Sequence, residues 1–255
     1  MINIFATAKS GMTAYQEKLD MLSNDLVNSS TTGYKSTDVG FKDLLTESLD
    51  RKGTPLVDKT AVNGTGVKLG TNYANNKQGN LLTTGGTTDL AIDGEGYFAS
   101  MQSDGSIAYT RDGNFKIDSN GVLVDSNGNK VYVEYENGAS EGNPALIGKD
   151  LSIDGSGGIT MKIGEEMVKV GNIPVFTAIG DKGFIPMGNS YYRANTDAQV
   201  GLSNDYNIRQ GFLEASNVDA SEVFSDVILT QRAFELSSKG ITVADELWGM
   251  INNMR

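Results

Sequence analysis

Both ends of this chain carry apolar residues at alternating spacings of three and four, and the middle carries no such repeat. Side chains at these spacings lie along one seam of a helix that packs against another helix. The sequence therefore predicts two terminal helices whose seams pair as a coiled-coil-like helical domain. The N-terminal seam consists of Phe5, Ala8, Met12, Tyr15, Leu19, Leu22 and Leu26, and the C-terminal seam consists of Val223, Val227, Thr230, Phe234, Ser237, Ile241, Ala244, Trp248 and Ile251.

The C-terminal segment carries a second apolar line at steps of seven, displaced by two positions from the first. Its members are Leu229, Leu236, Val243 and Met250. Because a helix turns by about 100° per residue, this line lies nearly opposite the seam. One partner helix cannot cover both lines, so we expect contacts with neighbouring copies of the chain. An ordinary two-helix hairpin inside a globular core is the alternative interpretation.

The two seams and the second C-terminal line together define a predicted self-assembly interface. Its residues are Phe5, Met12, Tyr15, Leu19, Leu22, Leu26, Val223, Val227, Leu229, Phe234, Leu236, Ile241, Val243, Trp248, Met250 and Ile251. We expect both termini to be poorly ordered in an isolated monomer and to fold on assembly, because the seam side chains alone do not offset the conformational entropy lost on ordering.

The middle of the chain is punctuated by regular turn signals. They are Asp93-Gly94, Asp104-Gly105, Asp112-Gly113, Asn120-Gly121, Asn127-Gly128, Asn137-Gly138 and Asp154-Gly155. Such pairs favour the positive-φ positions of tight hairpins and separate short apolar runs typical of an all-β domain. Later strands are expected over 159–163 and 168–179, with Pro174 marking an edge or bulge in the second.

The predicted fold class is α+β, with a mainly-β domain inserted between the helical ends. The boundaries are an N-terminal helix in 1–30, a connecting region of mixed loop in 31–84, a β-rich outer domain in 85–205, a return connector in 206–218 and a C-terminal helix in 219–255. Asp219 is the expected N-cap of that last helix. Gly11 and Gly240 lie beside the seams, where either close helix approach or a slight bend would explain them.

Composition excludes several classes of function. The net charge of -11 disfavours nucleic acid, and no apolar run is long enough to span a membrane. The chain has no Cys and no His, which removes thiol nucleophiles, Ser-His-Asp triads and the usual zinc sites. The N-terminus lacks the features of a cleaved signal peptide. We therefore expect no enzymatic activity, no cofactor and no metal.

Three weaker patterns have simpler explanations. The stretch from Asp118 to Lys130 suggests calcium ligands, but its spacing fails the EF-hand pattern and favours hairpin turns. Paired carboxylates such as Asp93 with Glu95, or Glu165 with Glu166, would suit a glycosidase, yet any acidic protein offers such pairs. Gly64-Thr65-Gly66 lacks the third glycine of a dinucleotide fingerprint and indicates a turn. A carbohydrate-binding or adhesive β module remains the alternative from a different class.

Four groups of motifs resemble the bacterial flagellar rod and hook protein family, in the family's order. They are Ser23-Asn24-Asp25-Leu26-Val27-Asn28 with Thr32-Gly33-Tyr34-Lys35; Ala91-Ile92-Asp93-Gly94-Glu95-Gly96-Tyr97-Phe98; Tyr109-Thr110-Arg111-Asp112-Gly113-Asn114-Phe115; and Gln210-Gly211-Phe212-Leu213-Glu214-Ala215-Ser216-Asn217-Val218 with Thr230-Gln231-Arg232-Ala233-Phe234-Glu235. Length and the segment 64–67 favour the distal-rod branch, ahead of the proximal-rod branch and a short hook protein.

The resemblance implies a non-catalytic subunit that polymerises helically into the axial rod linking the flagellar motor to the hook. It also implies neighbouring rod and hook proteins, the type III export apparatus and the surrounding basal-body bushing as partners, and a location outside the cytoplasmic membrane. Asp25 and Val27 depart from the Asn and Ala that are common in the family. We expect Asp25 to add charge and Val27 to add bulk in a crowded seam.

Overall fold

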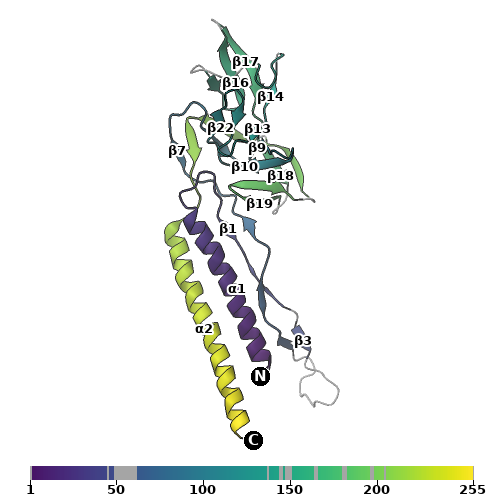
Figure 1. Cartoon of the computed structure of the whole chain (residues 1–255), viewed down its shortest axis with the longest axis vertical. Coiled ribbons are helices and arrows are strands. Elements are labelled where there is room, and N and C mark those ends of the chain that lie inside the picture. The colour runs from purple at the N-terminus through teal and green to yellow at the C-terminus, as the bar shows by residue number, and fades with distance from the viewer. Residues whose placement is uncertain are drawn as a thin grey trace. The chain divides into compact units, whose positions relative to one another are not determined.

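The computed structural model describes residues 2–44, 46–48, 62–136, 138–143, 146, 151–163, 166–179, 183–195, 198–203 and 205–254. The chain divides into two units (Figure 1). The first unit contains Met1–Val27, Thr37–Asn72 and Asp219–Arg255, and the second contains Asn28–Ser36 and Tyr73–Val218. No helix among the described residues has the length and apolar character needed to cross a membrane.

The first unit is built on two long helices, α1 (Ile2–Val27) and α2 (Ala220–Asn253). They lie side by side and run in opposite directions (Figure 1). Beside them the chain forms β1 (Thr37–Asp38), β2 (Phe41–Asp43), β3 (Thr46–Ser48), β4 (Val62–Gly64) and β5 (Val67–Leu69). Antiparallel pairing joins β2 to β5 and β3 to β4, and β5 contacts α1. The predicted terminal helices and the α+β class are thus confirmed.

The sequence allows a short helical or extended piece at Phe41, Leu44 and Leu45, and β2 begins at Phe41. The prediction of mixed loop for the remainder of 31–84 was wrong, because the remainder contains further short paired strands. Phe41 is paired with Leu69, so the partners are far apart in the sequence. Each strand has only two or three residues. Such segments are too short to show the alternation that marks a strand, and they depend on long-range pairing. Leu45, Gly53 and Pro55 lie outside the described residues.

The second unit consists of strands. They are β6 (Tyr73–Ala74), β7 (Leu81–Thr83), β8 (Leu90–Gly94), β9 (Phe98–Met101), β10 (Ile107–Thr110), β11 (Lys116–Ile117), β12 (Leu123–Val124), β13 (Lys130–Val131), β14 (Glu134–Tyr135), β15 (Leu151–Ile153), β16 (Gly158–Ile163), β17 (Glu166–Asn172), β18 (Phe176–Ile179), β19 (Phe184–Gly188), β20 (Tyr191–Ala194), β21 (Gln199–Leu202), β22 (Tyr206–Gln210) and β23 (Phe212–Glu214). The largest sheet has the order β11-β12-β13-β9-β10-β20-β19, and a second has the order β14-β17-β16-β15. Antiparallel pairs also join β8 to β22, β7 to β23 and β18 to β21.

Two apolar clusters hold the second unit together. The larger surrounds Phe98, Phe115 and Ile159, all of which are almost fully buried, and the rings of Phe98 and Phe115 meet edge to face. The smaller cluster gathers aromatic rings around Tyr97 and Tyr192. These cores are made by residues that are distant in sequence, so the strands depend on one another for burial.

The predicted strand over 168–179 is in fact two strands in different sheets. β17 ends at Asn172 and β18 begins at Phe176. Between them Ile173 donates its N–H to Gly157, while the carbonyl of Val175 accepts from Ser203. Pro174 has no N–H to donate, and it lies in this crossing rather than at a strand edge.

The turn signals explain most hairpins of the second unit. Gly105, Gly121 and Gly128 have positive φ and close the β9–β10, β11–β12 and β12–β13 turns. Asp112-Gly113 serves a different purpose, because a Cβ on Gly113 would lie 1.6 Å from the carbonyl oxygen of Leu90. That glycine permits a close backbone approach rather than a hairpin.

Candidate self-assembly interface

Helix α2 begins at the residue that the sequence predicts. The Asp219 carboxylate accepts the backbone N–H groups of Ser221 at 2.8 Å and Glu222 at 3.3 Å. These bonds satisfy donors that the first turn of a helix leaves without partners and stabilise the start of α2 by about 1 kcal/mol.

Two glycines, Gly11 and Gly240, lie where α1 and α2 face each other. A Cβ on Gly11 would lie 3.4 Å from Oγ of Ser237, and one on Gly240 would lie 3.5 Å from Cβ of Ala8. Both distances are ordinary van der Waals contacts, so the spacing of the two helices does not require a glycine at either position. Farther along, Lys18 and Asp226 form an ion pair at 3.8 Å.

The seams face inward along most of their length. Leu22, Val223, Thr230 and Ala244 are buried, and the polar Thr230 is only 4% exposed. Met12, Tyr15, Leu19, Leu26, Val227, Phe234 and Ile241 are half-buried. Phe5, Trp248 and Ile251 are exposed; they lie at the end of the helix pair where α1 begins and α2 ends. The seam side chains are more exposed at this end because the last turns of α2, which continue to Asn253, extend past the start of α1.

The second line of α2, which we call the outer stripe, is exposed throughout. Leu229 and Leu236 are each 68% exposed, Val243 is 53% exposed and Met250 is 55% exposed. Phe224 and Ile228 are also exposed on this helix and extend the apolar surface toward its start. The seven-residue repeat did not identify Phe224 and Ile228, because they are four positions apart and belong neither to the C-terminal seam nor to the outer stripe. Large apolar side chains gathered on one helix are typical of a protein interface.

Asp25 and Val27 occupy different environments near the end of α1. Asp25 is 3% exposed, and its carboxylate accepts the backbone N–H of Thr37. Val27 is 80% exposed, so the expected crowding of Val27 in the seam was wrong for the single chain. It stands at the last helical position, where the chain turns away.

A buried ionic cluster in the second unit was not predicted. The Glu214 carboxylate accepts from Lys35 Nζ at 2.6 Å and from Arg111 Nη1 at 3.1 Å. It also accepts the backbone N–H of Gly79 at 2.8 Å. Burial lowers the pKa of Lys35, and burial raises the pKa of Tyr97, whose ring lies 5.3 Å from the Arg111 guanidinium, to about 12.

Asn217 completes the attachment of the segments that enter and leave this unit. Its Oδ1 accepts the N–H of Ser36 at 2.7 Å, and its Nδ2 donates to the carbonyls of Asn75 and Lys77. Lys35 also donates to the Lys77 carbonyl at 2.7 Å. The cluster and Asn217 therefore tie together the three segments that carry the motifs around Lys35, Arg111 and Glu214.

The patterns considered for catalysis or metal binding have structural partners. Asp93 forms an ion pair with Arg209 at 2.6 Å. Asp118 and Asp125 accept backbone N–H groups within their own turns, which confirms the hairpin interpretation. Gly64 ends β4, and Gly66 has a φ of 136° before β5. Glu165 lies outside the described residues.

Comparison with known proteins matches three family models in order along the chain. They are the flagella basal body rod protein model over residues 5–35, the flagellar hook protein FlgE/F/G D1 domain over 91–171 and the flagellar basal body rod FlgEFG protein C-terminal model over 209–254. The first and last cover the two predicted seams, and the middle one covers much of the β unit.

Full-length relatives agree with these matches. The chain is 34% identical to the flagellar basal-body rod protein FlgG of Borreliella burgdorferi, covering 100% of this chain and 99% of that protein. It is 32% identical to FlgG of Bacillus subtilis, with 100% of both chains covered. It is also 28% identical to the flagellar hook-basal body complex protein FlhP of Bacillus subtilis, again over 100% of both chains.

Paired terminal helices with an inserted β unit, together with these matches, define a structural subunit and not an enzyme. The chain belongs to the flagellar basal-body rod protein family, and within it the chain is FlgG-like.

Proposed function

We propose that this subunit polymerises helically through its terminal helices into the axial drive shaft that links the flagellar motor to the hook. The observation that supports the proposal is the outer stripe, because four large apolar side chains are exposed on a helix whose opposite face is already covered by α1. Burying each of them on assembly contributes roughly 1.5–3 kcal/mol. The half-exposed seam residues Phe5, Trp248 and Ile251 add to this surface.

Within the polymer, we expect the seams of α1 and α2 to interlock as in a coiled coil, and the outer stripe to face other copies. The partners are further copies of the chain, the neighbouring rod and hook proteins, the flagellar type III export apparatus and the surrounding basal-body bushing. The location is the basal body outside the cytoplasmic membrane.

Leu236→Asp tests the outer stripe. A carboxylate buried between apolar helices is strongly unfavourable, so this variant should not polymerise. Gln231→Asp is the matched control, since it places the same charge on an exposed position of α2 away from the stripe. Polymer is measured by sedimentation and electron microscopy of the purified full chain, and circular dichroism verifies folding. Polymerisation of Leu236→Asp at the wild-type concentration would refute the assignment of the stripe.

A further inference from the structure

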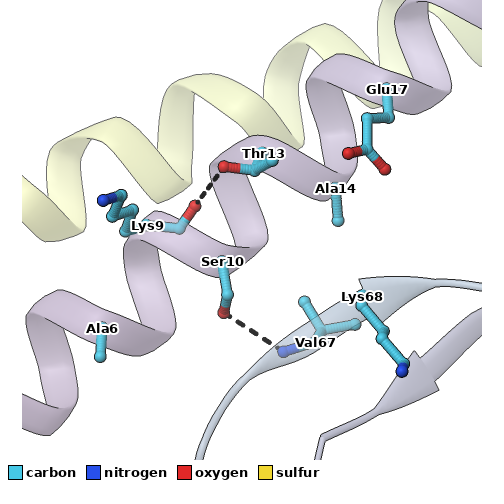
Figure 2. A pocket seen from close by; sticks show the side chains of 8 residues that line it. All are labelled: Ala6, Lys9, Ser10, Thr13, Ala14, Glu17, Val67 and Lys68. Atoms are coloured by element: carbon cyan, nitrogen blue, oxygen red, sulfur yellow. Dashed lines mark hydrogen bonds between the residues drawn. The ribbon is translucent and has the colours of Figure 1, made fainter.

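A groove lies between α1 and β5 in the first unit, on a side of α1 that α2 does not cover (Figure 2). Its volume is about 340 Å³. The lining residues are Ala6, Lys9, Ser10, Thr13, Ala14, Glu17, Val67 and Lys68.

The helix and the strand are fixed to each other at this groove. Ser10 Oγ accepts the backbone N–H of Val67 at 3.2 Å, as the dashed line in Figure 2 shows. A Cβ on Gly66 would lie 2.3 Å from the same oxygen, so the strand reaches the helix only because residue 66 is glycine. Small side chains such as Ala6 and Ala14 line the groove between these walls, and they leave room for larger side chains from outside.

We infer that this groove receives the outer stripe of α2 from a second copy of the chain. This inference rests on the proposed function and names the surface that the stripe contacts. Side chains that repeat every seven residues on a helix are about 10.5 Å apart, so two of them fit within the lined part of α1, which is about 16 Å long from Ala6 to Glu17. Large residues on the stripe thus meet small residues in the groove, as in the packing of helix ridges into grooves.

Charges at the rim of the groove select the direction of the incoming helix. Lys9 and Glu17 are the charged residues that α1 contributes to the lining, with Ala6 beyond Lys9 and Lys68 on the strand wall, and Lys239 and Glu246 flank the outer stripe at exposed positions. None of these four forms an ion pair with another residue in the described part of the chain.

Opposite charges meet when the incoming α2 runs antiparallel to this α1. Lys9 then lies beside Glu246 and Glu17 beside Lys239, which places Thr13 opposite Val243. The reverse direction would bring Lys9 beside Lys239 and Glu17 beside Glu246, and like charges in an interface are unfavourable.

Charge reversal tests the pairing in the full-length chain. Lys9→Glu and Glu246→Lys should each raise the critical concentration for polymerisation by about three- to tenfold at low salt. The double variant should polymerise more readily than either single variant. An equimolar mixture of the two single variants should do so too, because the reversed charge at position 9 of one copy can then pair with the reversed charge at position 246 of the other. Lys42→Glu is the control, since Lys42 is exposed on β2 and does not line the groove. Failure of the double variant to recover would overturn the pairing.

Disulfide crosslinking tests the register independently of stability. The chain contains no cysteine, so Thr13→Cys with Val243→Cys introduces the only two thiols. Under oxidising conditions the polymer should yield covalent ladders, whereas Thr13→Cys with Gln231→Cys should not.

Groove filling distinguishes failure of this inference from failure of the proposed function. Ala6→Trp should suppress polymerisation, while the near-ultraviolet circular dichroism of the tyrosines in the second unit stays unchanged. If Leu236→Asp abolishes polymerisation but Ala6→Trp polymerises normally and no Thr13–Val243 ladder forms, the outer stripe contacts another surface and the groove assignment is wrong. If Leu236→Asp also polymerises normally, the proposed function itself fails.

Discussion

Glu214 forms ion pairs with both Lys35 and Arg111 through one carboxylate, and the side chains of all three are at most 3% exposed. A buried ion pair adds little net stability compared with an apolar contact, but removal of one partner leaves an uncompensated charge in a poorly solvated place. Here the loss of Glu214 would leave two such charges. The cluster therefore makes folding of the second unit conditional on bringing its three segments together.

Glu214→Gln is expected to lower the free energy of unfolding by about 3–5 kcal/mol, because it removes the negative charge that pairs with both buried cations. Denaturant unfolding followed by near-ultraviolet circular dichroism of the tyrosines measures this change. Lys169→Gln, which breaks an exposed pair with Glu136, is the control and should cost at most about 1 kcal/mol. Equal effects of the two substitutions would show that Glu214 does not compensate buried charge.

Tyr97 is expected to lower the stability of the second unit as the pH becomes strongly alkaline. Burial raises its pKa to about 12, above the ordinary tyrosine value of 10.0, so the folded chain retains a proton that the unfolded chain loses. This contribution is complete below about pH 10 and is lost as the pH rises to about 12, and it amounts to about 3 kcal/mol. Tyr97→Phe should reduce the fall in unfolding free energy between these pH values. An unchanged fall would contradict the assignment to Tyr97.

Helix α2 has one face that is covered by α1 and another, the outer stripe, that is exposed. Val223, Thr230 and Ala244 are buried on the face that α1 covers, while the outer stripe has no covering element within its own unit among the described residues. The last turns, with Trp248, extend beyond the start of α1 and line a hollow of about 260 Å³ with Phe5, Ala244 and Asp245. An element of this kind is stabilised mainly by packing rather than by helix propensity.

Trp248 offers a direct report on this element, since it is the only tryptophan of the chain and is 53% exposed. On polymerisation its fluorescence emission should move to shorter wavelength, because the indole leaves water for an apolar contact. Amide exchange in α1 and α2 should slow at the same time, as the termini become ordered by assembly. The Leu236→Asp chain should show neither change under the same conditions, and a fluorescence shift without polymer would separate the two events.

The sequence predicted the elements of the whole molecule better than their long-range contacts. The helices and the Asp219 cap follow from local patterns, as do the hairpins at Gly105, Gly121 and Gly128. The short strands from Phe41 to Leu69 and the ionic cluster do not, because Lys35 lies 179 positions and Arg111 lies 103 positions from Glu214. Matching seven-residue repeats predicted that α1 and α2 meet, but strands of two or three residues have no such repeat to indicate their partners. The motifs around those three residues were visible, but their shared buried charge was not.

Placement of the whole subunit in the cell is tested by imaging basal bodies from a strain that lacks this chain. If the chain forms the distal part of the axial rod, the axial structure should stop below the hook, and wild-type protein supplied in trans should restore the hook. Leu236→Asp supplied in the same way should not extend the rod, because its outer stripe then carries a charge that is unfavourable to bury between apolar helices. Normal hooks in the deletion strain would exclude a role as an essential axial segment. An extended rod built from Leu236→Asp would show that the outer stripe does not hold the polymer together.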